Sequence, residues 1–234
     1  STNGGATWAV FQTPTPNASN TTQTAYVNYV PKVQFSLAAG FYSGTQSVTL
    51  SCPQSNVTIR YTTNGAIPST TSTLYSGPIS ITATTSLRAR AFDNNNQYAG
   101  SFTETNTYFI NETHTLPVIS ATSSNFTNLF SNGQDITGTM EFFSTAGQQV
   151  FEIEGDFNKH GNDSWAYPQK GVDFNVEDEY GQGDQIQKKM FYTSPRKKFK
   201  WLILKAAASD NFPGNAGSHP AAHIRDAYIQ TLAE

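Results

Sequence analysis

The stretch NVTIRYTTNG, from Asn56 to Gly65, carries the pattern that decides the fold. Its apolar and polar side chains alternate, with Val57, Ile59 and Tyr61 on one side and Thr58, Arg60 and Thr62 on the other. Period-2 alternation of β-branched and aromatic residues predicts a strand with one face on a core and one face in water. The closing Thr-Asn-Gly is a turn signal.

The same pattern continues outward along the chain. In TSLRARAFD (85–93), Leu87, Ala89 and Ala91 point one way, whereas Arg88 and Arg90 point the other way, toward the expected wet face. QSVTLS (46–51) also alternates, and turn signals such as SGP and DNNN separate the segments at short intervals. Short strands at regular spacing predict a small antiparallel β-sandwich.

Composition supports a mainly β protein with some α structure. The 234 residues correspond to one or two domains. Only 13% are charged and 13% are aromatic, a profile typical of extracellular β-rich proteins that excludes a coiled coil or a disordered chain. The net charge of −3 argues against nucleic acid as partner, and no apolar run is long enough to span a membrane. Cys52, the single cysteine, reads as an apolar filler near a strand.

Linker and turn segments divide the chain into three parts. Residues 1–32, with TPTPNASNTTQT, predict an extended tail or linker that packs little. Residues 33–112 hold the alternating strands, and NETHTL (111–116) forms a joint. Residues 113–234 predict a second unit with a hairpin around Ala146-Gly147.

Within that second unit, the side-chain pattern predicts the orientation of three further elements. In the hairpin, Phe151 and Ile153 are expected inward and Glu152 and Glu154 outward. GVDFNVED (171–178) reads as a strand with Val172, Phe174 and Val176 on its apolar face. FKWLILKAAA (199–208) has a continuous apolar run, which predicts a strand buried on both faces. SHPAAHIRDAYIQTLAE (218–234) predicts an amphipathic helix.

Several of these stretches resemble known families. GFYSG, IRYTTNGAIPS, YSGPISI and TSLRARAF, across residues 34–110, resemble the chitobiase/β-hexosaminidase C-terminal type domain. The resemblance implies a small immunoglobulin-like sandwich of the kind that forms accessory parts of larger exported proteins. Asn64 stands where the family has Asp, a change that a turn tolerates. GGATWAVFQTPTPNASN (4–20) resembles the closing strand of a lamin-tail-type sandwich.

Most of residues 116–234 resemble the N-terminal half of the CotH-type spore-coat kinase family, through MEFFSTAGQQVFEIEGDFNKHGNDSWAYPQKGVDFNV and HIRDAYIQTLAE. That implies a partial α+β kinase-like domain in which Lys170 faces nucleotide phosphates, with an exposed loop lysine as the alternative. Arg225, next to Asp226 in the expected helix, either binds a phosphate or forms a structural ion pair that ties the helix to the sheet. Gly171 stands where the family often has Ser, and the family's metal-binding aspartates have no counterpart here. We therefore expect no catalytic or metal-binding residue in this chain, with ATP and magnesium only in a full-length domain.

Four other patterns admit two readings each. His219 and His223 have i, i+4 spacing for a metal, but Pro220 between them favours a cap or surface role. DFNKHGND (156–163) echoes a calcium loop, although a bulged turn explains it better. The cations are either a solvated loop or a phosphate-facing rim: Lys188, Lys189, Arg196, Lys197, Lys198 and Lys200. Three tyrosines are either core residues or sugar-stacking residues: Tyr42, Tyr61 and Tyr75.

The sequence thus favours a non-catalytic structural or interaction module within an exported, bacterial, multidomain surface protein. Its expected partners are other domains of the same polypeptide or cell-surface components, and its expected location is secreted or on the cell surface. Two alternatives stay open: an atypical CotH-like protein kinase in full-length form, and a carbohydrate-binding surface adhesin.

Overall fold

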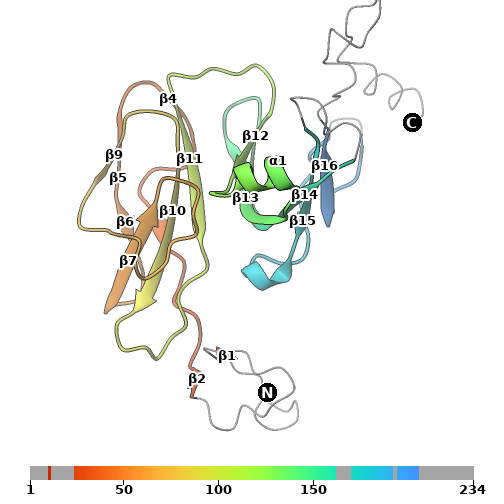
Figure 1. Cartoon of the computed structure of the whole chain (residues 1–234). Helices are drawn as coiled ribbons and strands as arrows, with labels where there is room; N and C mark the ends of the chain where they lie inside the picture. Colours follow the sequence, from red (N-terminus) through yellow and green to blue (C-terminus); the bar gives the residue numbers. More distant parts are fainter. Residues whose placement is uncertain (1–9, 12–23, 162–169, 192–193, 206–234) are drawn as a thin grey trace, which may run out of the picture. The chain divides into compact units, whose positions relative to one another are not determined.

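The structure, a computed structural model, describes residues 10–11, 24–161, 170–191 and 194–205 (Figure 1). The described part is mainly β, with one short α-helix, α1 (Phe126–Asn132), and a 3-10 turn at Asp178–Tyr180. It forms two compact units. The first comprises the described residues up to Ser124 together with Thr139–Glu152, and the second comprises Asn125–Gly138 and those from Ile153 onward.

The main sheet of the first unit has five strands in the order β4-β11-β10-β7-β8 (Figure 1). Their bounds are β4 Gly40–Tyr42, β7 Val57–Thr62, β8 Thr73–Leu74, β10 Thr85–Asp93 and β11 Glu104–Ile110. β10 pairs antiparallel with both β7 and β11, as expected. The prediction of a wholly antiparallel sandwich is wrong at one place, because β4 pairs parallel with β11.

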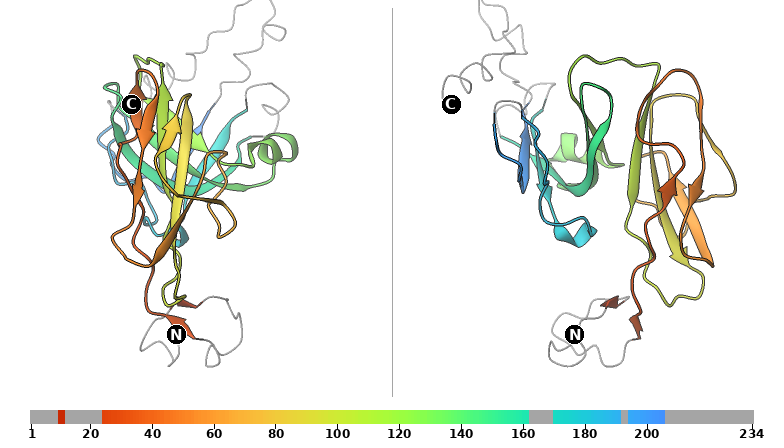
Figure 2. Two further views of the ribbon diagram at one scale, coloured as in Figure 1. Left: turned by 90° about the vertical axis from the view of Figure 1, so that its left-hand side faces the viewer. Right: turned by 180° about the vertical axis from the view of Figure 1, so that it is seen from behind.

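Two small sheets form the second layer of this sandwich, and Figure 2 shows the strands (orange to yellow-green) from two further sides. One sheet pairs β3 (Gln34–Phe35) with β6 (Leu50–Ser51), and the other pairs β5 (Gln46–Val48) with β9 (Ile79–Ile81). The shared core contains Val48, Leu50, Ile81, Leu87, Ala89, Ala91, Tyr108 and Ile110. This confirms the inward face predicted for 85–93.

The core also takes residues from the stretch expected to be a linker. Val30 is 2% exposed and belongs to the core cluster. Its amide donates to the Ala99 carbonyl, and the Val27 amide donates to the Gln97 carbonyl. Further upstream, β1 (Val10–Phe11) pairs with β2 (Ala25–Tyr26). Residues 24–32 therefore pack more than their composition suggested.

On the opposite face of β10, Arg88 was expected to be exposed to solvent, and this expectation is wrong. This side chain is fully buried, and it donates to the Gly65 carbonyl at 2.7 Å and to Thr139 Oγ1 at 3.1 Å. Thr139 lies on a strand of the second half of the chain, and Thr139 itself belongs to the same compact unit as Arg88. Alternation alone could not reveal that another strand covers this face.

A second, curled five-stranded sheet has the order β12-β13-β14-β15-β16, and β13 and β14 each contribute residues to both compact units. The bounds are β12 Val118–Thr122, β13 Ile136–Phe143, β14 Gln149–Lys159, β15 Val172–Val176 and β16 Trp201–Leu204. The predicted hairpin turn is confirmed, since the Gly147 amide donates to the Ser144 carbonyl and Gly147 has φ +75°.

The second unit has its own aromatic core, in which the Phe157 ring lies 4.7 Å from that of Phe174 and 5.3 Å from that of Phe126 of α1. Val172, Phe174 and Val176 are buried as predicted, whereas Glu154, expected outward, is 3% exposed. The turn or calcium loop expected at 156–163 is also wrong over its described part, because Asp156–Lys159 continue β14.

β16 is not buried on both faces, because its side chains alternate. Leu202 is buried, but Trp201 is 58% exposed and Ile203 is 43% exposed. β16 is the last strand in the sheet order, and the face that carries Trp201 and Ile203 is open. The helix expected at 218–234 lies outside the described residues. Among the described helices, none is long and apolar enough to cross a membrane.

Candidate functional site

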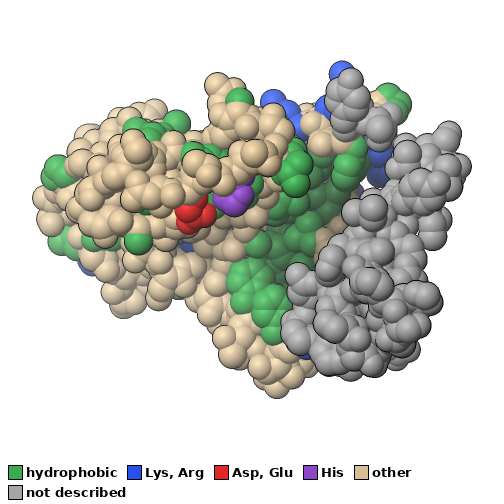
Figure 3. Space-filling model, turned by 90° about the horizontal axis from the view of Figure 1, so that it is seen from above, with side chains coloured by type: hydrophobic (Ala, Val, Ile, Leu, Met, Phe, Trp, Pro, Cys, Tyr) green, Lys and Arg blue, Asp and Glu red, His purple; other side chains and the backbone are tan. Residues whose placement is uncertain are grey.

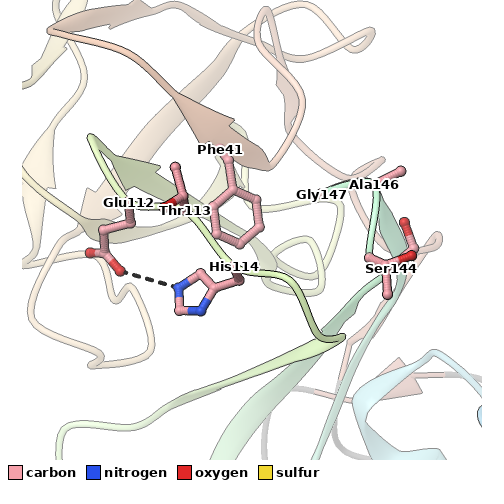
Figure 4. A pocket seen from close by; sticks show the side chains of 8 residues that line it. Phe41, Glu112, Thr113, His114, Ser144, Ala146 and Gly147 are labelled. Carbon is pink, nitrogen blue, oxygen red and sulfur yellow. Dashed lines mark ion pairs between the residues drawn. The ribbon is translucent and has the colours of Figure 1, made fainter.

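A shallow pocket of about 220 Å³ opens in the first unit, where the end of β11 meets the β13–β14 turn (Figure 4). Its walls come from three segments: β4, the loop after β11, and the hairpin turn. The lining residues are Phe41, Glu112, Thr113, His114, Ser144, Thr145, Ala146 and Gly147.

Asn111 directs the loop after β11 over Phe41. It adopts the left-handed conformation with φ +59°, which asparagine tolerates better than most residues. Its amide donates to the Tyr42 carbonyl at 2.8 Å, and its side-chain oxygen accepts from the Gly44 amide at 2.8 Å. These two bonds hold the start of the loop against β4, so that Glu112 and His114 reach the pocket.

Phe41 is the phenylalanine that lines the pocket, and other aromatic rings pack against it. Phe41 stacks on Phe109 with ring centroids 4.4 Å apart, and Phe143 meets both rings edge-on. His114 lies edge-on to Phe41 at 5.3 Å. A Cβ on Gly147 would lie 3.0 Å from Phe41 Cδ2, so a glycine is needed for the hairpin turn to approach this ring.

A carboxylate and an imidazole form the polar wall. Glu112 Oε2 and His114 Nε2 are 3.6 Å apart, and both side chains are 41% exposed (Figure 4). The Thr84 hydroxyl donates to Glu112 Oε1, which orients the carboxylate. On the face shown in Figure 3, acidic and histidine side chains occupy a small spot amid uncharged groups. An aromatic ring, a carboxylate, an imidazole and hydroxyl groups therefore line one small pocket.

A second polar constellation lies buried between β11 and the strands β12–β14. Glu141 Oε1 accepts from the Thr107 amide at 2.9 Å and from Gln149 Nε2 at 2.8 Å. The Thr107 hydroxyl also donates to Glu141 Oε2. Burial raises the pKa of Glu141 to about 7, although hydrogen bonds from Thr107, Gln149 and Ser120 oppose the rise. Glu141 and Thr107 are both buried, so these bonds form inside the packed layer.

The residues expected to bind phosphate are only partly placed by the structure. Lys170 is half-buried, and Gly171 separates it from the first residue of β15, Val172. Arg225, Asp226, His219 and His223 lie outside the described residues. The six cations of 188–200 are exposed, as a solvated loop predicts. Within the described residues, no group of acidic, histidine or cysteine side chains could hold a metal ion.

The three tyrosines considered for sugar stacking pack against the sandwich core instead. Tyr42, Tyr61 and Tyr75 are all partly buried against it. Cys52 packs there too, as expected of an apolar filler. The tyrosines' contacts are those of core residues.

Sequence reasoning missed the pocket, because it treated 111–116 only as a joint. The one local signal was Glu-x-His, a carboxylate and an imidazole two residues apart in a stretch otherwise poor in charge. Phe41 and Gly147 gave no signal, since their meeting depends on the packing of distant segments.

Comparison with known proteins bears on the sandwich alone. No curated protein matches the chain, and no finding supports a CotH domain. Residues 37–105 match the family model of the Chitobiase/beta-hexosaminidase C-terminal domain, which confirms that resemblance for the immunoglobulin-like sandwich.

Proposed function

We propose that this chain is a non-catalytic structural and interaction module of an exported, multidomain surface protein. The family match at residues 37–105 supports this, because such immunoglobulin-like modules are typical of multidomain carbohydrate-active or surface proteins. Its partners are then other domains of the same polypeptide or components of the cell surface.

The observation that carries the proposal is that residues of β13 cover and hydrogen-bond the polar side chains on one face of the main sheet. Arg88 and Thr107 on this face contact Thr139 and Glu141 of β13. Buried charged and polar groups are costly when their partners are misplaced, so such a layer favours one arrangement of the strands. A module held in this way keeps its own strands in one arrangement, as a structural module requires.

A cut in the loop before β12 tests this role. We insert a specific protease site after Thr115, within the exposed residues 111–117. After cleavage, the two pieces should elute together in native gel filtration and separate in denaturant, because the buried layer joins them without the covalent link.

The matched control carries the same cut together with Arg88→Ala, and its pieces should separate at a lower denaturant concentration. Pieces of the parent chain that separate under native conditions would show that the sandwich and the strands after it are not one structural unit.

A second candidate is a CotH-like kinase in a longer protein, favoured by the position of Lys170 in the segment that leads into β15, two residues before Val172. The proposal of a non-catalytic module predicts that this chain transfers no phosphate from radiolabelled ATP, with magnesium or manganese, beyond a Lys170→Ala control. Transfer that depends on Lys170 would contradict it and support the kinase.

A further inference from the structure

We propose that the pocket formed by Phe41, Glu112, His114 and the β13–β14 turn binds a single neutral pyranose ring of a saccharide. This is a binding function in addition to the structural role of the sandwich, and it rests on different residues.

The size of the pocket indicates a single ring. Sites for drug-sized ligands measure about 300–1,000 Å³, whereas this pocket holds about 220 Å³. Its open side would leave the rest of an oligosaccharide in solvent. One sugar unit at the end or side of a glycan chain therefore fits better than a nucleotide or an extended peptide.

The chemistry of the walls indicates a sugar. The C–H groups on one face of a pyranose carry slight positive charge and pack well against an aromatic ring, whose face is negative. Phe41 supplies that ring, and the Glu112 carboxylate can accept hydrogen bonds from ring hydroxyls. Hydroxyl groups of Ser144 and Thr145 line the other side.

The charge of the walls indicates a neutral sugar. Among the described residues that line the pocket, Glu112 is acidic and none is lysine or arginine. An anionic sugar or a phosphate would meet a carboxylate without a strong cation to offset it. We therefore expect hexoses or N-acetylhexosamines, and not uronic acids.

The geometry also holds the polar wall in place before a ligand arrives. Thr84 fixes one oxygen of Glu112, and His114 is held between the carboxylate and the rings of Phe41 and Phe109. Such preorganisation reduces the entropy lost on binding.

The test is NMR titration of the ¹⁵N-labelled 234-residue chain with cellohexaose, tri-N-acetylchitotriose and mannotriose, with digalacturonate as the acidic comparison. At least one neutral probe should shift the amides of Glu112, His114 and Gly147. Glu112→Gln should weaken that binding about tenfold, the effect of losing one charged hydrogen bond. Ala146→Leu, at an exposed turn position, should fill the pocket and abolish binding.

His160→Ala is the matched control, because His160 Nδ1 and Asp173 Oδ1 form the other described imidazole–carboxylate pair, at 2.9 Å, away from the pocket lining. It should bind as the parent does. Three results overturn the proposal: no neutral probe shifts the pocket amides at millimolar concentration, Glu112→Gln and Ala146→Leu bind like the parent, or digalacturonate binds best. None of these results bears on the cleavage experiment, so the two proposals fail separately.

Discussion

Glu141 of β13 ends a network of hydroxyl groups that come from three other strands, β12, β10 and β11. Thr122 donates to Ser86, Ser86 shares a bond with Thr107 at 2.7 Å, and Thr107 donates to Glu141. The carboxyl is fully enclosed. Removing a carboxylate from water favours its protonated form, so this network is coupled to the proton concentration outside.

Glu141→Gln should therefore remove a pH dependence of stability. The folded pKa of about 7 lies above the unfolded value of about 4.3. The stabilising contribution is thus complete below about pH 4 and is lost as the pH rises through 7, on the order of 3 kcal/mol in all. Urea unfolding at pH 5 and pH 8 should show this loss in the parent and not in the variant.

Glu179→Gln provides the control, since Glu179 is exposed. It should follow the parent at both pH values. Parallel pH dependence in the parent and in Glu141→Gln would show that the buried carboxyl does not titrate in this range.

At the scale of elements, the turn after β7 contacts the end of β12, the strand that follows the sandwich in the sequence. Gly65 is buried at φ +80°, and a Cβ there would lie 2.6 Å from the backbone of Ser123. Its carbonyl accepts from the buried Arg88, and the preceding Asn64 accepts from the Ala66 amide at 3.1 Å. This turn therefore positions both the arginine and the end of β12.

Gly65→Ala should destabilise the chain more than Gly44→Ala does. Both glycines have similar left-handed φ angles, +80° and +70°, but nothing lies within 4 Å of a Cβ on Gly44. Gly44→Ala should cost about 1 kcal/mol for the backbone alone, and Gly65→Ala should exceed it because the Ser123 backbone must move. The free energy of unfolding of the two variants measures the difference, and equal values would contradict the close approach.

Strand alternation predicted well where one strand face meets the core of its own sandwich. Leu87, Ala89 and Ala91 followed the pattern, and so did Val172, Phe174 and Val176 of β15. It failed at Arg88, whose partners Gly65 and Thr139 lie far from it along the chain, and at Glu154, which is buried. The continuous apolar run at 199–208 misled in the opposite sense, because such a run does not reveal that Trp201 belongs to the last strand of a sheet.

Across the whole molecule, sparse charge is the feature that both composition and structure share. With 13% charged residues, the chain relies on hydroxyl and amide groups for polar contacts, and the layer beside Arg88 is built from threonine and serine. The family of the sandwich could be predicted from its turns and strands. The pocket could not, because it depends on Asn111, Phe41 and Gly147 meeting in space.

The parallel pairing of β4 with β11 has a mechanical consequence. Gly40 lies opposite Tyr108 and Tyr42 lies opposite Ile110, so both strands start at the same end of the ladder. Tension that pulls the chain apart at Gly40 and Ile110 acts along the strands in opposite directions. The ladder bonds then carry the load together in shear, rather than opening one after another as in an antiparallel pair pulled from one end. A module of a multidomain surface protein, the role proposed above, would meet this kind of load.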